Sequence, residues 1–265
     1  MLRRLVTRSL ATLLLCAAAS ATASAQDFQK NYQLGPNGSI EIENVSGNIQ
    51  IAAHEGPGVS VSVFKEGRDR DKVSVEDLST GDRVFLKAKY DEDCNCDASL
   101  RFEVRVPRSS RLNYESIRTA SGDISAHGIA GQIKLQTASG NVSLEDVSGD
   151  VDASTASGSV KVREASGTVS ARSASGNVDV EIARLEGARD LKFASASGDV
   201  SVRLPNNLDA KVHISTASGD IDTNFPLEVK RRENGPGSTA RGQLGGGTRL
   251  LRISSASGDV SLKSL

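Results

Sequence analysis

A short phrase built around Ser-Gly recurs through this chain at a fixed spacing, and it constrains the fold more than any other feature. From Gly122 to Gly176 the glycines recur every nine residues, and Thr/Ser-Ala-Ser-Gly recurs every eighteen, from Thr119 to Ser173. Such self-similarity is typical of stacked repeats, so we expect one coil for each eighteen residues. The tetrad Ser-Gly-x-Val/Ile occurs ten times, beginning at Ser46, Ser121, Ser139, Ser148, Ser157, Ser166, Ser175, Ser197, Ser218 and Ser257.

Apolar and polar residues alternate between the glycines, which indicates strands with one buried face. If the coils stack, equivalent apolar residues align in columns. The first column is Ile124, Val142, Val160 and Val178, and the next is Ala126, Leu144, Val162 and Val180. The column two residues before each Thr/Ser-Ala-Ser-Gly is Ile117, Leu135, Ala153, Ala171, Phe193, Ile214 and Ile253. Because all seven members are apolar, we assign the later, irregularly spaced copies to the same stack.

Glycine suits the corners of such coils, because a sharp turn commonly needs a positive φ. Asp or Asn after the glycine can form an Asx turn, and the neighbouring Ser or Thr hydroxyl can bond the coil above or below. Two turns in eighteen residues predict a flattened, two-sided parallel β-solenoid with a thin Ala/Val core. The predicted turn glycines are Gly122, Gly140, Gly149, Gly158, Gly167, Gly176, Gly198, Gly219 and Gly258.

Residues 1–25 resemble an export signal, with a basic start, the apolar run Leu10–Ala19 and the small-residue motif Ala23-Ser24-Ala25. A lipoprotein signal on Cys16 is the alternative, but Leu15 is too large for the usual preceding residue. The apolar run is too short to cross a bilayer, and no later run approaches the ~20 residues needed. Cleavage would remove three arginines and take the formal charge from −1 to −4, which disfavours nucleic-acid binding. We therefore expect an exported protein, periplasmic, at the cell surface or extracellular.

Residues 26–118 alternate without the strict repeat, and we expect a β-strand block continuous with the repeat solenoid of residues 119–265. The phrase Val45–Ile49 already belongs to the repeat, and the block would cover one end of the stack. The predicted strands are Phe28–Leu34, Ser39–Asn44, Asn48–Ala53, Val59–Lys65, Val73–Leu78, Arg83–Tyr90, Leu100–Val106 and Leu112–Arg118.

The coils lengthen after Val180, and the last two repeat glycines are 39 residues apart. The interval contains a Gly/Pro/charged segment at about 222–250, which we expect to be a surface loop that either binds a partner or caps the stack. One last repeat then closes the chain. Its strand, Asp259–Leu262, would offer an edge for self-association if the loop leaves it bare.

The acidic segment Asp91–Asp97 contains Cys94 and Cys96, the two cysteines outside the signal. In an oxidising compartment a small disulfide loop is favoured. A metal site from both thiolates and nearby carboxylates, or pairing between molecules, are the alternatives, although two sulfurs without a histidine fall short of the usual zinc set. Stacked calcium sites would need an acidic residue after each glycine, and Gln132, Ser159 and Thr168 interrupt that column. We predict neither a cofactor nor a metal.

No motif for nucleophilic, metal-dependent or phosphate chemistry is present, and His54, His127 and His213 lie in unrelated contexts. Some solenoids cut acidic polysaccharides with charged residues on an outer strand face. Stacked outward charges do occur here, with Glu145 near Arg163 and Glu181, and Lys134 near Asp152. Opposite charges one rung apart are explained more simply as a solvated ladder. We therefore predict no catalytic residues.

At the repeats the chain resembles a bacterial family called putative adhesins, exported β-strand-repeat proteins of unknown function. The matching phrases are Val45–Ile49, Thr119–Val180, Ser195–Val200, Thr216–Ile221 and Ser255–Val260, and the glycine-rich approach Leu244–Thr248 is also similar. The resemblance implies an exported β-solenoid. Adhesion is an inherited label of the family, and envelope-stress roles are suspected for some members. It defines no catalytic residue.

These observations favour a non-enzymatic, envelope-associated binding or adhesin-like module whose partner is an unidentified envelope protein or glycan. A polysaccharide-active enzyme on the same scaffold, or a structural envelope-stress protein, are the alternatives.

Overall fold

The computed structural model describes residues 26–265 except 93, 188, 232 and 234, so the predicted signal at 1–25 lies outside the described residues. The described chain is built from strands, with one 3₁₀ turn, η1 (Arg70–Lys72). The all-β prediction is therefore confirmed. No described helix is long and apolar enough to span a membrane.

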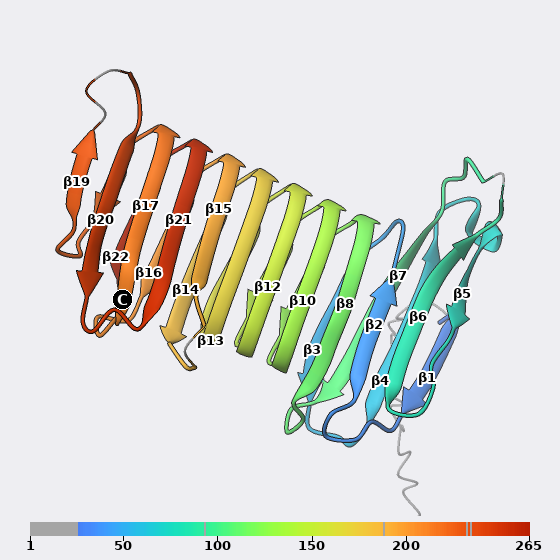
Figure 1. Cartoon of the computed structure of the whole chain (residues 1–265). Coiled ribbons are helices and arrows are strands. Elements are labelled where there is room, and N and C mark those ends of the chain that lie inside the picture. Colours follow the sequence, from blue (N-terminus) through green and yellow to red (C-terminus); the bar gives the residue numbers. More distant parts are fainter. Residues whose placement is uncertain (1–25, 93, 188, 232, 234) are drawn as a thin grey trace, which may run out of the picture.

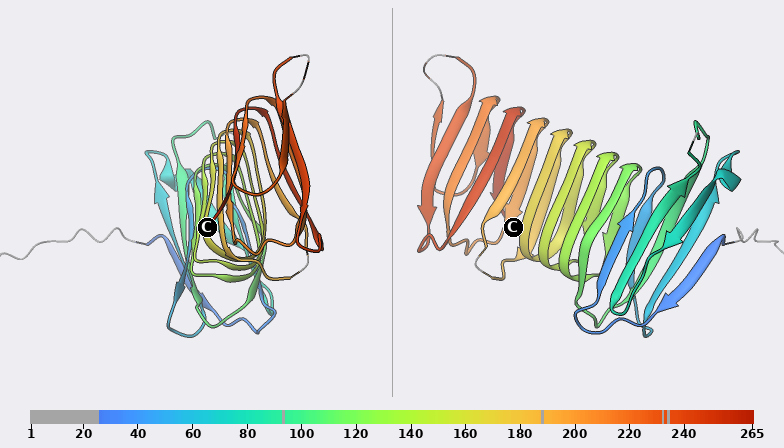
Figure 2. Two further views of the ribbon diagram at one scale, coloured as in Figure 1. Left: turned by 90° about the vertical axis from the view of Figure 1, so that its left-hand side faces the viewer. Right: turned by 45° about the vertical axis from the view of Figure 1, so that its right-hand side comes forward.

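The strands form a long, flattened stack of two layers with a thin apolar core between them (Figure 1; Figure 2, left). In order along the stack, the first layer contains β1 (Phe28–Tyr32), β4 (Val59–Glu66), β7 (Ser99–Pro107), β3 (Ile49–His54), β9 (Ile124–His127), β11 (Val142–Glu145), the start of β13 (Val160–Ser175), β14 (Val178–Arg184), β16 (Val200–Leu204), β22 (Val260–Ser264) and β18 (Ile221–Thr223).

The second layer lies across the core from the first. In the same direction it contains β5 (Val73–Asp77), β6 (Arg83–Tyr90), β2 (Ser39–Glu43), β8 (Leu112–Ser121), β10 (Ala130–Ser139), β12 (Ser148–Ser157), the end of β13, β15 (Leu191–Ser197), β21 (Arg249–Ser257), β17 (Ala210–Ser218), β20 (Ser238–Leu244) and β19 (Glu228–Arg231). Because β13 runs round a corner from one layer to the other, hydrogen bonding links all 22 strands into one sheet.

Pairing in the middle of the stack is parallel and has the predicted register. Val142 lies beside Val160 on one side and Ile124 on the other, and Leu135 lies beside Ala153. The predicted column from Ile117 to Ile253 is buried along its whole length. The ends differ, because β1, β4 and β7 pair antiparallel at one end and β17, β20 and β19 at the other. The architecture is thus a mixed, β-solenoid-like stack rather than a wholly parallel one.

The nine predicted turn glycines all have a positive φ. Gly158 shows a second constraint, since a Cβ there would lie 2.1 Å from the Gly140 carbonyl oxygen of the preceding coil. The motif hydroxyl also bonds between coils, and Thr155 Oγ1 donates to that same oxygen at 2.8 Å. The prediction of Asx turns within one corner was wrong, because the Asp123 carboxylate instead accepts from the Asn141 amide of the next coil at 2.7 Å.

The last repeat does not lie at the end of the stack, which corrects the prediction of an exposed edge at Asp259–Leu262. β21 lies between β15 and β17, and β22 lies between β16 and β18. The predicted 222–250 loop instead contains β19 and β20, which form a hairpin beyond β17 (Figure 1). The last repeat therefore has strand partners on both sides, while the short β18 and the hairpin form the edges.

The N-terminal block joins the repeats through parallel pairs of β2 with β8 and β3 with β9. All eight strands predicted in this block are present, with ends shifted by at most three residues. At its outer end the two layers are linked through Asp77 of β5, which accepts hydrogen bonds from Lys30 at 2.6 Å and from the Tyr32 hydroxyl at 3.0 Å. Side chains from β1 thus close this end of the core.

Candidate functional site: the outer face of the second layer

A groove of about 940 Å³ crosses the outer face of the second layer from β8 to β15. Strand alternation turns Ile133, Val151 and Val169 toward the core and leaves their neighbours outward. Two polar rows consequently cross the groove. The first row is Gln132, Asp150 and Thr168, and the second is Lys134, Asp152, Ser170 and Lys192.

Asp150 is held by partners from two directions. Thr168 on the adjacent coil donates its hydroxyl hydrogen to Oδ1, and Arg189, which precedes β15, reaches back to Oδ2 at 2.7 Å. The Thr168 hydrogen bond, followed by the Arg189 charge, lowers the pKa of the Asp150 carboxyl. This carboxylate therefore stays ionised at neutral pH and is unsuited to act as a general acid.

Three polar groups of residues that line the groove are buried and have no hydrogen-bond partner among the described residues. One is the hydroxyl of Tyr114, whose side chain lies in the core, and the other two are the Ser170 hydroxyl oxygen and the Arg172 Nε. Arg172 uses its Nη1 to reach Asp152 at 3.6 Å, so its guanidinium is only partly satisfied. Because buried polar groups are normally hydrogen-bonded, the unpartnered atoms of Ser170 and Arg172 single out this part of the groove as a candidate binding surface.

The groove continues in two directions. Toward one corner it meets a hollow of about 510 Å³ whose floor includes Gly131, Gly149 and Gly167. These glycines are required by stacking, since a Cβ on Gly149 would lie 2.1 Å from the Gly131 oxygen. Toward the other corner Arg172 also lines a shallow hollow of about 730 Å³ built from the Ala, Ser and Thr of the repeat motif. Together the three hollows form an elongated surface of mixed character, mainly apolar in the last hollow, which suits an extended ligand better than a compact one.

On the outer face of the first layer, the arginines of β13 and β16 are paired with carboxylates. Arg163 pairs with Asp179 at 2.6 Å and with Glu181 at 3.3 Å, and Arg203 pairs with Glu181 at 2.9 Å. Glu145 lies opposite Arg163 in register. This arrangement fits the expected cross-strand ladder.

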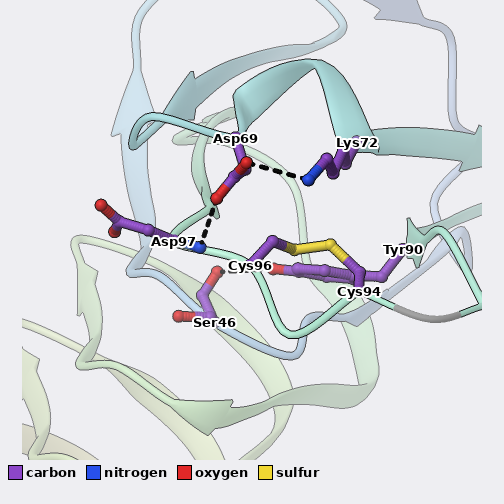
Figure 3. The surroundings of a disulfide bond; sticks show 7 residues. All are labelled: Ser46, Asp69, Lys72, Tyr90, Cys94, Cys96 and Asp97. Carbon is purple, nitrogen blue, oxygen red and sulfur yellow. Dashed lines mark hydrogen bonds and ion pairs between the residues drawn. A yellow bond between two sulfur atoms is a disulfide. The ribbon is translucent and has the colours of Figure 1, made fainter.

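Cys94 and Cys96 lie at the N-terminal end, where the structure joins them by a disulfide with their Cα atoms 4.9 Å apart (Figure 3). Asp69 braces the loop, because its carboxylate accepts from the Asp97 amide and pairs with Lys72, both at 3.0 Å. Neither cysteine lines the groove. In the described part of the chain, no group of three or more His, Cys, Asp or Glu is placed to hold a metal.

The three histidines are not brought together. His54 closes a turn through Gly56 and Gly58, His127 lies 3.9 Å from Glu145, and His213 faces outward on β17. Sequence reasoning named Lys134 and Asp152 but missed Thr168, Ser170 and Arg172. Their position within the repeat was the available signal, since each is an outward residue of a strand that the periodicity had already located.

A model of the family described as Toastrack DUF4097 matches residues 30–263. No curated protein matches the chain. Among solved structures, a putative cell adhesion protein from Clostridium sporogenes ATCC 15579 has 11% identity and a TM-score of 0.42, covering 90% of this chain and 99% of its own. A putative adhesin from Bacteroides fragilis NCTC 9343 has 13% identity and a TM-score of 0.41, covering 90% of this chain and 96% of its own.

Proposed function

Because the chain belongs to the Toastrack DUF4097 family, we propose that it is an exported β-solenoid that serves as a non-enzymatic binding module of the cell envelope. Its binding surface is the outer face of the second layer. The observation that carries this proposal is the groove pair Ser170 Oγ and Arg172 Nε, which are buried and have no partner among the described residues.

A binding role accounts for the groove better than catalysis does. Asp150 is engaged by Thr168 and Arg189, and Asp152 by Arg172, so both carboxylates act as fixed acceptors. A hydrolase or lyase would need a carboxyl group or base free to exchange a proton near its working pH. The length of the groove along the stack fits an extended glycan or peptide segment of the envelope.

The proposal is tested by incubating purified protein with separated outer-envelope, peptidoglycan and soluble fractions. We expect one envelope fraction to retain the protein and the double variant Ser170→Ala/Arg172→Gln to lose that retention. Arg203→Gln on the first layer is the matched control and should be retained as the unchanged protein is. Equal retention of all three proteins would place binding elsewhere, and release of soluble fragments from the fraction would favour an enzyme.

A further inference from the structure

Beyond the groove, one outward position carries a positively charged or titratable nitrogen on four successive strands of the second layer. Lys192 of β15 lies directly beside Arg252 of β21, Arg252 beside His213 of β17, and His213 beside Arg241 of β20. With strands ~4.8 Å apart, this row spans about 14 Å along the stack. We call these four residues the basic row.

The basic row has little compensation, because Glu228 of β19 lies opposite Arg241 but pairs with Lys230. Lys192, Arg252 and Arg241 are exposed, and none of them forms an ion pair with a carboxylate of the described residues. Lys211, two residues before His213 on β17, adds a further exposed cation to the same face. Like charges directly opposite one another destabilise a sheet, and their spacing is well inside the ~8 Å screening length of physiological salt. Repulsion between neighbouring cations lowers the stability of the sheet, so the presence of the row indicates a role outside folding.

General charge does not explain the row. The whole chain has a formal charge of −1, and the arginines of the opposite face, Arg163 and Arg203, are paired with carboxylates. Lys161 and Arg105 of the first layer are also exposed without an ion pair among the described residues, but neither lies beside another cation. The strand neighbours of Lys161 are Ser143 and Asp179, and those of Arg105 are Ala52 and Ser60. Burial first, and then the positive charges of Arg241 and Arg252, lower the pKa of His213, as expected for a titratable nitrogen between two cations.

The basic row is a direct extension of the groove. Ser170, whose hydroxyl lacks a partner among the described residues, lies beside Lys192 in register, and Lys192 itself lines the groove. A chain lying in the groove along the stack axis would therefore pass over Lys192, Arg252, His213 and Arg241 in turn.

We propose that the basic row binds a linear acidic polysaccharide, whose successive carboxylates would meet the successive cations of the row. This inference rests on the proposed function, because it names the ligand class for the same face. The single-file arrangement fits a narrow polymer that runs along the stack.

Two other polyanions fit less well. Single-stranded nucleic acid is bound with aromatic side chains on which bases stack, and Phe193, the aromatic residue of β15, is buried in the core. A membrane surface would need apolar side chains to insert beside the cations. Ala194, Ser254 and Ser215 beside the row are small or polar, and Leu250, a large apolar residue flanking it, is partly buried.

The test measures binding of the full protein to polygalacturonate, with carboxyl-reduced polygalacturonate as the matched uncharged polymer. The triple variant Lys192→Gln/Arg252→Gln/Arg241→Gln removes the row. Lys161→Gln/Arg105→Gln/Arg68→Gln removes the same charge from other exposed positions and serves as the control. We expect the row variant to lose about tenfold or more in affinity and the control to change less than about twofold. Oligothymidylate and vesicles of anionic lipid are tested in parallel.

The outcomes separate this inference from the proposed function. Equal binding of the reduced polymer, or an unchanged affinity in the row variant, overturns the inference, as does tighter binding of oligothymidylate or vesicles. If an envelope fraction still retains the protein in those cases, the proposed function stands. If neither polymer binds and no fraction retains the protein, both fail. Circular dichroism of each triple variant shows that the exposed substitutions leave the fold intact.

Discussion

The Asp259 amide donates a hydrogen bond of 2.8 Å to the Asp199 carboxylate, although the two residues are 60 positions apart. Asp259 in turn accepts from the Asp220 amide at 2.8 Å. The last repeat is therefore held between two earlier ones, and the corner ladder that begins at Asn48 continues through it. This order of coils decides which residues lie in the interior and which lie at the edge.

The order can be tested by placing one charge at equivalent positions of two coils. Val260 is fully buried in the inserted coil, whereas Ile221 of the edge coil is only partly buried. We expect Val260→Asp to lower the free energy of unfolding by about 3–5 kcal/mol, because it places an unpaired carboxylate in the core, and Ile221→Asp to cost clearly less. Urea unfolding of both variants measures this. The reverse ranking would mean that the repeats stack in sequence order.

Replacing a turn glycine by alanine should destabilise the fold for two separable reasons, the positive φ and the close approach of the neighbouring coil. Gly81 has a positive φ but open space around it, while Gly158 has a positive φ and the Gly140 oxygen in the way. We expect Gly81→Ala to cost about 1–2 kcal/mol and Gly158→Ala to cost about 1–3 kcal/mol more. Thermal melts of the two variants provide the comparison. Equal losses would show that the coils at this corner are less closely stacked.

Asp77 should make the closure of the N-terminal end sensitive to acid. Burial would raise its pKa, but hydrogen bonds from Lys30, Ser79 and Tyr32 outweigh it and bring the pKa to about 2, below the ordinary 3.8. Since the folded pKa is the lower one, the carboxylate stabilises the fold above pH ~4 and loses that effect as the pH falls toward 2.

The matching variant is Asp77→Asn. We expect it to be about 2 kcal/mol less stable than the unchanged protein at pH 7, with the difference shrinking as the pH approaches 2. Denaturant unfolding at several pH values measures the difference. A gap that is the same at pH 7 and near pH 2 would contradict the assigned partners.

The Cys94–Cys96 disulfide closes a very short loop, so it constrains the unfolded chain little. We expect Cys94→Ser/Cys96→Ser to lower stability by at most about 2 kcal/mol and to leave retention by the envelope fraction unchanged. The pull-down with and without reductant measures the second effect. Loss of retention with reductant would show instead that this loop contributes to binding.

Binding of an acidic polymer should strengthen as the pH falls. Arg252, Arg241 and Lys211 surround His213, and the neighbouring strand β19 places Glu228 opposite Arg241. The His213 pKa is depressed in the free protein, and a bound polyanion would raise it, so protonation and binding favour each other. We expect higher affinity at pH about 5.5 than at pH about 7.5. The polymer's carboxylates remain ionised at both values, so the difference reports on the protein. His213→Gln should flatten this dependence, and an unaltered pH profile would remove the histidine from the row.

The repeat itself made much of the fold predictable. Because side chains recur at fixed positions, the neighbours of Val142 and Val160 follow from the eighteen-residue period, and the structure pairs them as expected. The position of the last coil was not predictable. Its phrase Ser-Gly-Asp-Val at Ser257 is identical to the phrase at Ser197, so it is compatible with any position in the stack. The long interval before it indicated an excursion without showing where the chain returns.

The candidate site was predictable in part. Lys192, His213 and Arg252 each precede a member of the apolar column, Phe193, Ile214 and Ile253, so their shared outward position is visible in the aligned repeats. Their adjacency depends on the inserted coil, which brings Arg252 between the other two. Arg241 comes from the hairpin, where no repeat marks its register.

The most direct test of the binding face is a lysine-labelling footprint of the protein with and without its bound polymer or envelope fraction. Lys192 and Lys211 lie on the outer face of the second layer, and Lys161 lies on the outer face of the first. We predict that the ligand protects Lys192 and Lys211 from acetylation while Lys161 reacts as before. Protection of Lys161, with Lys192 and Lys211 still reactive, would contradict the account.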